Sequence, residues 1–269
     1  MIERLAAATA TPAAFAPWRE AGRPVVLTGA ADRLDLPELA AALGGRTLTA
    51  RLYGERIGRP KAEWPGYCDF LPLTLEAYGE LLARREAHRR RIYLAQVPVE
   101  GRPAAEVGRL AERLGLVAMS AANLWVGPAG HVEPLHYDPM DGVLMQLRGA
   151  KRVRLLPPAQ TANLYPFPLF GGALRPWFAQ VYLEQPDGDA FPRLDAALDA
   201  AVELELAEGE ALYIPAGWWH EVTALGDDYV ISVNRFQQVR PLSRLLGVRL
   251  GVPLYAAFAM RRLLSPRAA

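Results

Sequence analysis

The chain has 269 residues, of which 51% are hydrophobic, so it can bury a sizeable core and is not disordered as a whole. Its formal net charge of +1 provides no strong field to attract nucleic acid or an anionic membrane, and no uninterrupted apolar stretch is long enough to span a bilayer. The single cysteine, Cys68, excludes an internal disulfide and a thiolate-rich metal site, and it favours a reducing, cytoplasmic environment.

The first part of the chain alternates helix and strand signals. Thr11 followed by Pro12 is typical of a helix start, because a capping hydroxyl precedes a proline at the first helical position. The alanine-rich start up to Pro17 lacks the net charge and the leucine-rich run of a secretory signal, so we interpret it as an ordinary N-terminus. Further along, we expect strands at 24–28, 47–53 and 91–97, and helices at 37–43, 74–87 and 103–114.

From residue 121 onward the pattern changes to short strands separated by glycine and proline turns. Many short strands at regular spacing predict a sandwich or a barrel. The stretch 165–192 is rich in proline, glycine and aromatic residues and predicts a loop-bearing insertion; loops of that length are usually functional. The expected strands are 123–126, 132–137, 143–147, 152–156, 181–184, 202–206, 211–214, 220–224 and 229–236.

The predicted fold is therefore mainly β, a single barrel with helices at both ends. We assign residues 1–240 to the barrel domain with its N-terminal elaboration and residues 241–269 to a C-terminal helical segment. Four arginines and a proline interrupt 242–264, which favours a pair of amphipathic helices. Their apolar faces are too large for the last helix of a barrel to hide alone, so we expect a homodimer through this segment.

Two of the four histidines stand in a pattern that suits a metal ion. His136 precedes Asp138 by two positions in an expected strand, where such residues point to the same side. His220 follows a turn that Pro215 and Gly217 impose. Two histidines and one carboxylate form the facial triad of non-haem iron(II) oxygenases. About a quarter of such chains contain a His-x-Asp by chance. The alternative interpretation of His220 is a turn histidine bonded to the backbone. The surrounding sequence must therefore decide whether these residues form a metal site.

Lys151 is the second unusual residue. It begins the apolar face of an expected strand, on the side of Val153 and Leu155. Because a lysine is almost never buried without a partner, an anionic ligand is one explanation of this position. The alternative is a side chain at the strand edge that extends into solvent.

Several motifs occur in a fixed order over roughly residues 90–236. They are HVEPLHYD at 131–138, QLRGAKR at 146–152, LLPP at 155–158, LYP at 164–166, GEALYIPAGWWH at 209–220 and SVN at 232–234. Together they resemble the JmjC family, and more narrowly its cupin-like branch, which includes an asparaginyl hydroxylase and small JmjC protein hydroxylases.

The resemblance implies a double-stranded β-helix, the jelly-roll barrel of the cupins. It also implies a dioxygenase that depends on Fe(II), 2-oxoglutarate and O2, hydroxylates a C–H bond and releases succinate and CO2. His136, Asp138 and His220 match the family's iron ligands and would form the catalytic centre.

Further positions match or depart from the family's cosubstrate site. Lys151 matches the lysine that pairs with the distal carboxylate of 2-oxoglutarate. Tyr93 matches a tyrosine that reaches the same carboxylate, and Asn234 matches an asparagine that lines the site. Glu133 stands where relatives carry threonine or serine, and Gly142 where an asparagine often follows the His-x-Asp motif. A carboxylate beside a dianionic cosubstrate should repel it, unless Glu133 turns toward the substrate.

The substrate is expected to be a protein or a peptide. Relatives in this branch hydroxylate residues within polypeptides, and the aromatic insertion at 165–192 can present an apolar groove for an extended chain. Demethylation is less favoured, because the sequence has no basic patch of the kind expected of a chromatin enzyme. The alternatives are a small-molecule hydroxylase, a non-catalytic metal-binding cupin module and a zinc hydrolase on the same barrel.

Overall fold

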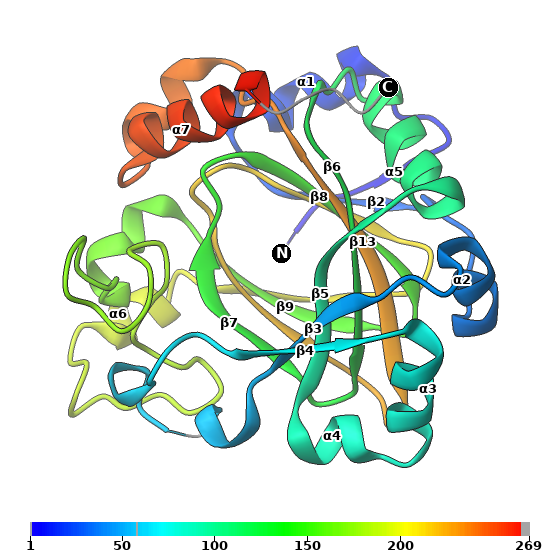
Figure 1. The fold of residues 1–269 in the computed structure, drawn as a ribbon. Helices are drawn as coiled ribbons and strands as arrows, with labels where there is room; N and C mark the ends of the chain where they lie inside the picture. The colour runs from blue at the N-terminus through cyan, green and yellow to red at the C-terminus, as the bar shows by residue number, and fades with distance from the viewer. Residues whose placement is uncertain (1, 58, 265–269) are drawn as a thin grey trace.

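The fold, taken from a computed structural model that describes residues 2–57 and 59–264, consists of two facing sheets (Figure 1). The larger sheet has nine strands in the order β1 (Arg4–Ala6), β2 (Val25–Thr28), β11 (Ala211–Ile214), β8 (Asp141–Arg148), β13 (Tyr229–Gln237), β6 (Ala118–Pro128), β5 (Ile92–Val99), β3 (Leu48–Leu52) and β4 (Asp69–Leu73). The smaller sheet has the order β10 (Val202–Leu206), β9 (Lys151–Leu156), β12 (Trp219–Ala224) and β7 (Val132–Tyr137). This arrangement confirms the predicted jelly-roll barrel with flanking helices.

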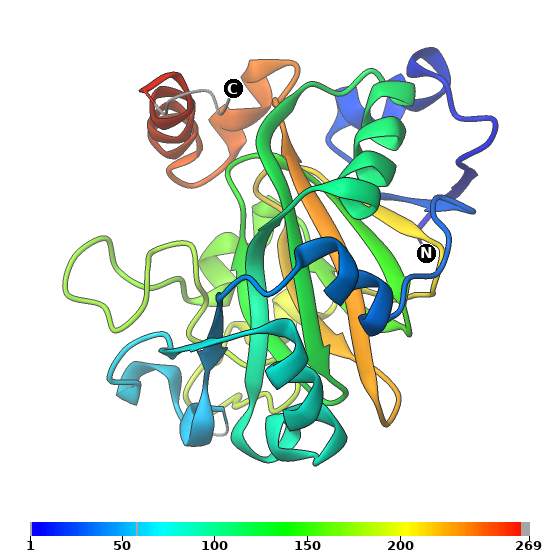
Figure 2. The ribbon, with the colours of Figure 1, turned by 45° about the vertical axis from the view of Figure 1, so that its right-hand side comes forward.

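The helices lie outside the barrel. They are α1 (Pro12–Ala21), α2 (Leu36–Leu43), α3 (Leu75–Ala83), α4 (Glu86–Arg90), α5 (Gly101–Arg113), α6 (Leu194–Leu198) and α7 (Gly251–Leu264), with short 3-10 helices η1 (Gly54–Arg56), η2 (Lys61–Glu63), η3 (Pro158–Leu164) and η4 (Leu242–Gly247). Figure 2 shows α2, α3 and α5 over the outer face of the larger sheet, and the largest apolar cluster fills that layer. No helix among the described residues is long and apolar enough to cross a membrane.

Apolar side chains also fill part of the barrel interior. Val153 and Leu155 of β9 and Val222 of β12 are buried in a cluster with residues of β2, β8, β10 and β11. The charged Arg152 and Arg154 alternate with them on β9, as the period of two in a strand requires. This alternation turns Lys151 to the inner side as well, and its side chain is buried.

Most expected elements are present, but two predictions were wrong. The helix expected at 74–87 is divided into α3 and α4, because Arg85 adopts a φ of 55° that no α-helix continues through. The strand expected at 181–184 is irregular: the carbonyl of Val181 accepts a hydrogen bond from the Lys61 ammonium, and Glu184 pairs with Arg152. The sequence analysis also missed β1, β4 and α6; β4 lies at a sheet edge, where Pro72 is tolerated.

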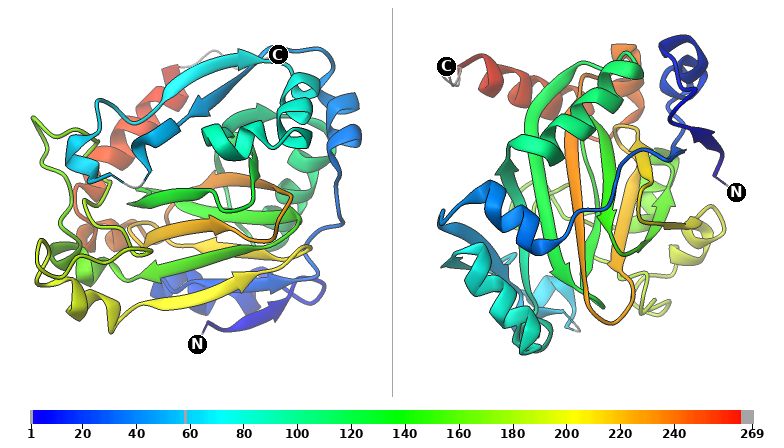
Figure 3. Two further views of the ribbon diagram at one scale, coloured as in Figure 1. Left: turned by 90° about the horizontal axis from the view of Figure 1, so that it is seen from below. Right: turned by 90° about the vertical axis from the view of Figure 1, so that its right-hand side faces the viewer.

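The C-terminal segment packs on one end of the barrel, beside the insertion of residues 165–192, as Figure 3 shows. Tyr255 and Ala259 of α7 contact a small cluster of Met119, Met140 and Phe236. Other large apolar side chains of the segment face solvent: Leu246 is 80% exposed and Met260 is 58% exposed. The homodimer through this segment, and the boundary at residue 240, stay predictions.

Candidate metal centre and the cavities around it

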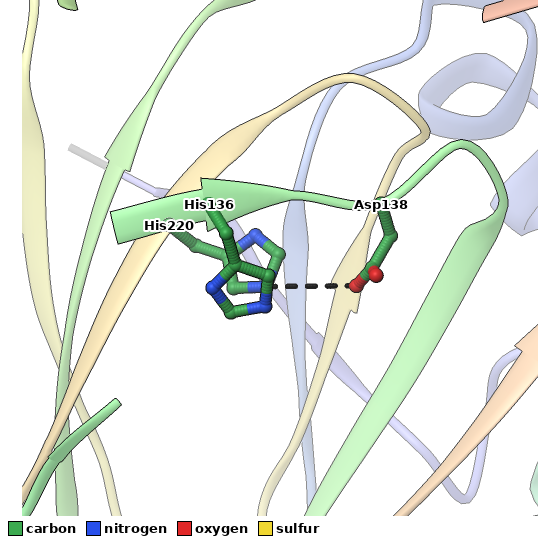
Figure 4. A group of neighbouring side chains, drawn as sticks. All are labelled: His136, Asp138 and His220. Carbon is green, nitrogen blue, oxygen red and sulfur yellow. Dashed lines mark ion pairs between the residues drawn. The ribbon is translucent and has the colours of Figure 1, made fainter. Parts of the chain in front are cut away.

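Three side chains converge at the mouth of the barrel: His136, Asp138 and His220 (Figure 4). The antiparallel register of β7 and β12 places His136 opposite His220. Asp138 follows the end of β7, and its carbonyl accepts a hydrogen bond of 2.8 Å from the amide of Gly217 in the turn before β12. One ligand atom from each of the three residues lies within 4.8 Å of the others, and His220 Nε2 is 3.6 Å from Asp138 Oδ2.

Backbone carbonyls orient both imidazoles. Nδ1 of His136 lies 2.7 Å from the carbonyl oxygen of Pro134, and Nδ1 of His220 lies 3.0 Å from that of Trp218. An N–H donated to each carbonyl leaves the Nε2 lone pair for an ion, which is the usual arrangement around a metal. Burial and the neighbouring His220 lower the pKa of His136 to about 4, and burial lowers the pKa of His220. Both rings are therefore neutral near pH 7, as metal binding requires.

The donor set fits the ion implied by the resemblance. Two neutral imidazoles and one carboxylate, without a thiolate, are typical of a non-haem iron(II) site with open coordination positions. The three donors are held by paired strands and a tight turn, so they are positioned before an ion arrives.

An inner pocket extends from these donors into the barrel and ends at Lys151. The Lys151 ammonium donates to Ser232 Oγ at 2.6 Å and lies 3.4 Å from the Tyr93 hydroxyl. Within the described residues it forms no ion pair, and burial lowers its pKa to about 8. Asn234 lines the same pocket and accepts a hydrogen bond of 2.9 Å from the Trp125 indole. A buried ammonium bonded only to hydroxyls is the environment that an anionic ligand would complete.

Glu133 lines both this pocket and the wider groove outside it. The Arg51 guanidinium lies 3.3 Å from Glu133 Oε1, which also accepts a short hydrogen bond from the Tyr67 hydroxyl. The Tyr53 hydroxyl donates to Oε2 at 3.2 Å. Burial alone would raise the pKa of Glu133, but neighbouring His131 and Arg51 outweigh it and hold that pKa well below its usual range. The carboxylate is thus ionised and balanced by Arg51, which reduces its repulsion of an anionic cosubstrate.

The sequence analysis missed several of these residues. Arg51, Tyr53 and Tyr67 come from the N-terminal elaboration, and nothing near them in the sequence indicates that they contact Glu133. Ser232 was identifiable, because it precedes Asn234 by two positions on β13 and so faces the same side. The six residues predicted to form the site all lie around the inner pocket: Tyr93, His136, Asp138, Lys151, His220 and Asn234.

The groove outside the metal donors is large, with a volume of about 2260 Å³. Its walls include the insertion and α7. Arg249, just before α7, donates to the carbonyls of Pro176 at 2.6 Å and Phe167 at 3.3 Å, which fixes one side of the insertion. Lys61 binds the carbonyls of Ala179 and Val181 farther along the insertion. The buried Lys61 and the half-buried Arg249 therefore hold this wall in place through bonds to backbone oxygens.

The first prediction concerns the metal. The purified protein should bind one iron(II) ion per chain, and His136→Ala or Asp138→Ala should lose it, because two donors cannot replace the facial set. Metal content after anaerobic loading and desalting checks this. His88→Ala is the matched control, since that histidine bonds to the carbonyl of Asp228 away from the site. Retention of stoichiometric iron by both site variants would contradict the assignment.

Comparisons with known proteins agree with this geometry. The model of a family described as the cupin-like domain matches residues 75–240. Lysine-specific demethylase JMJ31 of Arabidopsis thaliana is 34% identical over 48% of this chain and 23% of its own length. Lysine-specific demethylase 8 of Xenopus tropicalis is 40% identical over 41% of this chain and 24% of its own length. The matched part thus spans about a quarter of these relatives. The chain belongs to the cupin-like JmjC family, whose members use Fe(II), 2-oxoglutarate and O2.

Proposed function

We propose that the protein is a 2-oxoglutarate-dependent dioxygenase that hydroxylates a side chain within a protein or peptide. The observation that carries this proposal is the buried Lys151 ammonium, which has no ion pair in the described chain and ends the pocket that begins at His136, Asp138 and His220. When bound, iron(II), 2-oxoglutarate and O2 supply the oxidising chemistry, in which one oxygen atom enters a C–H bond and the other leaves in succinate, with release of CO2.

The residues of the pocket bind and enclose the cosubstrate. Lys151 and Tyr93 supply a positive charge and a hydroxyl for the distal carboxylate, at the end of the pocket away from the metal donors. Val222 and Leu144 line the pocket between its two ends and exclude water. Arg51 keeps the Glu133 carboxylate from acting as a free negative charge beside the dianion.

The groove supports a polypeptide substrate over a free metabolite. Pockets for small molecules commonly have volumes of about 300–1,000 Å³, and the groove of about 2260 Å³ exceeds them. Exposed apolar side chains mark its edge, with 84% of Phe170 and 69% of Phe70 exposed. Such an open groove suits an extended chain that places one side chain at the metal. The relatives of this chain include proteins named lysine-specific demethylases, a name that gives an amino-acid residue as the target.

The experiment is a search for oxidised peptides. Iron-loaded protein, 2-oxoglutarate and a peptide library or lysate should yield peptides heavier by one oxygen atom, together with succinate. His136→Ala provides the inactive control. Oxidation of small metabolites alone would favour the small-molecule alternative, and loss of a methyl group would mark a demethylase. Iron binding without succinate from any sample would favour the non-catalytic cupin module.

A second prediction concerns Lys151. Lys151→Met leaves the distal carboxylate without its cation, a loss on the order of 2–5 kcal/mol if the pair is buried. The KM for 2-oxoglutarate should rise steeply while iron content is unchanged. With wild-type protein this KM should also rise as the pH increases through about 8, because Lys151 loses its proton there. Lys151→Arg should lack this increase, since a guanidinium stays charged. An unchanged KM in Lys151→Met would place the carboxylate elsewhere.

A third prediction concerns the Arg51–Glu133 pair. Arg51→Met leaves a buried carboxylate unpaired, which should cost about 3–5 kcal/mol of stability and raise the KM for 2-oxoglutarate by repulsion. Glu133→Gln should not raise that KM, because it removes the negative charge. The double variant should recover most of the loss in Arg51→Met. Thermal unfolding and cosubstrate kinetics of all four proteins form a double-mutant cycle. Simple addition of the two single effects would show that the residues act separately.

A further inference from the structure

The groove has an unequal distribution of charge. Its charged lining residues are four arginines and two carboxylates: Arg51, Arg175, Arg261, Arg262, Glu133 and Asp138. The two carboxylates are already engaged, since Glu133 pairs with Arg51 and Asp138 belongs to the metal donors. Arg51 is engaged in the same pair, so the charged lining residues outside this pair and the metal donors are all arginines.

Two exposed arginines, Arg175 and Arg262, come from different elements of the groove wall. Arg175 belongs to the insertion, and its guanidinium has no hydrogen bond or ion pair within residues 2–57 and 59–264. Arg262 belongs to α7, where its Nη1 lies 3.6 Å from the Met119 sulfur, a weak acceptor. Neither guanidinium is neutralised by a carboxylate of the described chain, so both are open to an anionic group of a ligand.

Apolar side chains accompany the arginines along the groove. Phe70 of β4 and Leu169 and Phe170 of the insertion are exposed and line it. Phe258 of α7 lines the same groove. A ligand that matches this surface carries apolar groups together with carboxylates, whereas a lysine- or arginine-rich segment would meet like charge.

We propose that the groove binds a polypeptide segment in which acidic residues flank an apolar stretch around the oxidised residue. This inference rests on the proposed function and names the class of its substrate. Arg175 and Arg262 are the specificity-determining residues: they attract the flanking carboxylates and disfavour basic segments. The selected polypeptide is therefore acidic around the oxidised residue, unlike a basic protein tail.

Binding is tested separately from turnover. The full chain is loaded with manganese(II) and 2-oxoglutarate without O2 and is titrated with three peptide libraries that share a randomised apolar centre and carry flanking Glu, Gln or Lys. Fluorescence anisotropy with an uncharged dye reports the affinity. The Glu library should bind about tenfold more tightly than the Gln library, the Lys library should bind most weakly, and added salt should reduce the preference.

Charge reversal identifies the residues responsible. Arg175→Glu combined with Arg262→Glu should abolish or invert the preference for Glu over Lys flanks, and the Arg175→Gln and Arg262→Gln pair should remove it without inversion. Arg109→Glu is the matched control, because Arg109 is exposed on α5 and does not line the groove. The KM for 2-oxoglutarate and the iron content should stay at their wild-type values in all variants.

The outcomes separate the two proposals. Equal affinity for the three libraries, tighter binding of the Lys library, or an unchanged preference in the double reversal overturns the acidic-segment proposal but leaves a polypeptide hydroxylase possible if peptides are oxidised. If no library binds and only small metabolites are oxidised, the polypeptide substrate fails as well. Preferential binding and oxidation of the Glu library that is lost on charge reversal supports both.

Discussion

The antiparallel pairing of β7 with β12 brings together two segments that are more than 80 residues apart in the chain. It places His136 opposite His220, and the turn before β12 holds Asp138 through its carbonyl. β9 pairs with the other edge of β12, so that Leu155 lies beside His220 and Lys151 beside Ala224. The pairing of β12 with its two neighbours thus sets the positions of the metal donors. It also sets how far along the sheet the Lys151 ammonium lies from them.

Buried charge is the second constraint on this barrel. Glu133 is balanced by Arg51, and Asp141 is balanced by Arg244 through two bonds of 2.9 Å. Lys151 differs from these residues, since its bonds go to hydroxyls and the Glu133 carboxylate is committed to other partners. An ammonium kept in this state lowers stability unless a ligand provides the opposite charge. This unfavourable burial of the Lys151 ammonium is the reason why we propose that the pocket binds an anion.

The groove depends on segments outside the strands that carry the metal donors. Arg249 and Lys61 fix the insertion by binding its backbone carbonyls, so an irregular stretch forms a stable wall. α7 supplies further residues of the groove, which gives the C-terminal segment a place beside the candidate site in addition to the homodimer predicted for it. In the proposed function, the jelly-roll barrel supplies the chemistry and the added segments select the substrate.

The sequence by itself indicated the candidate metal donors and some of the residues of the inner pocket, because strand periodicity and ordered motifs are local properties. It identified His136, Asp138 and His220, and it singled out Lys151 from its place on an apolar strand face. Only the tertiary structure decided how Glu133 is neutralised, because its partner Arg51 lies 82 residues away. The tertiary structure also decided that residues 181–184 form no strand, since a side-chain bond from the distant Lys61 to a carbonyl of this stretch overrides its local propensity. It likewise brought the insertion and α7 together to line one groove.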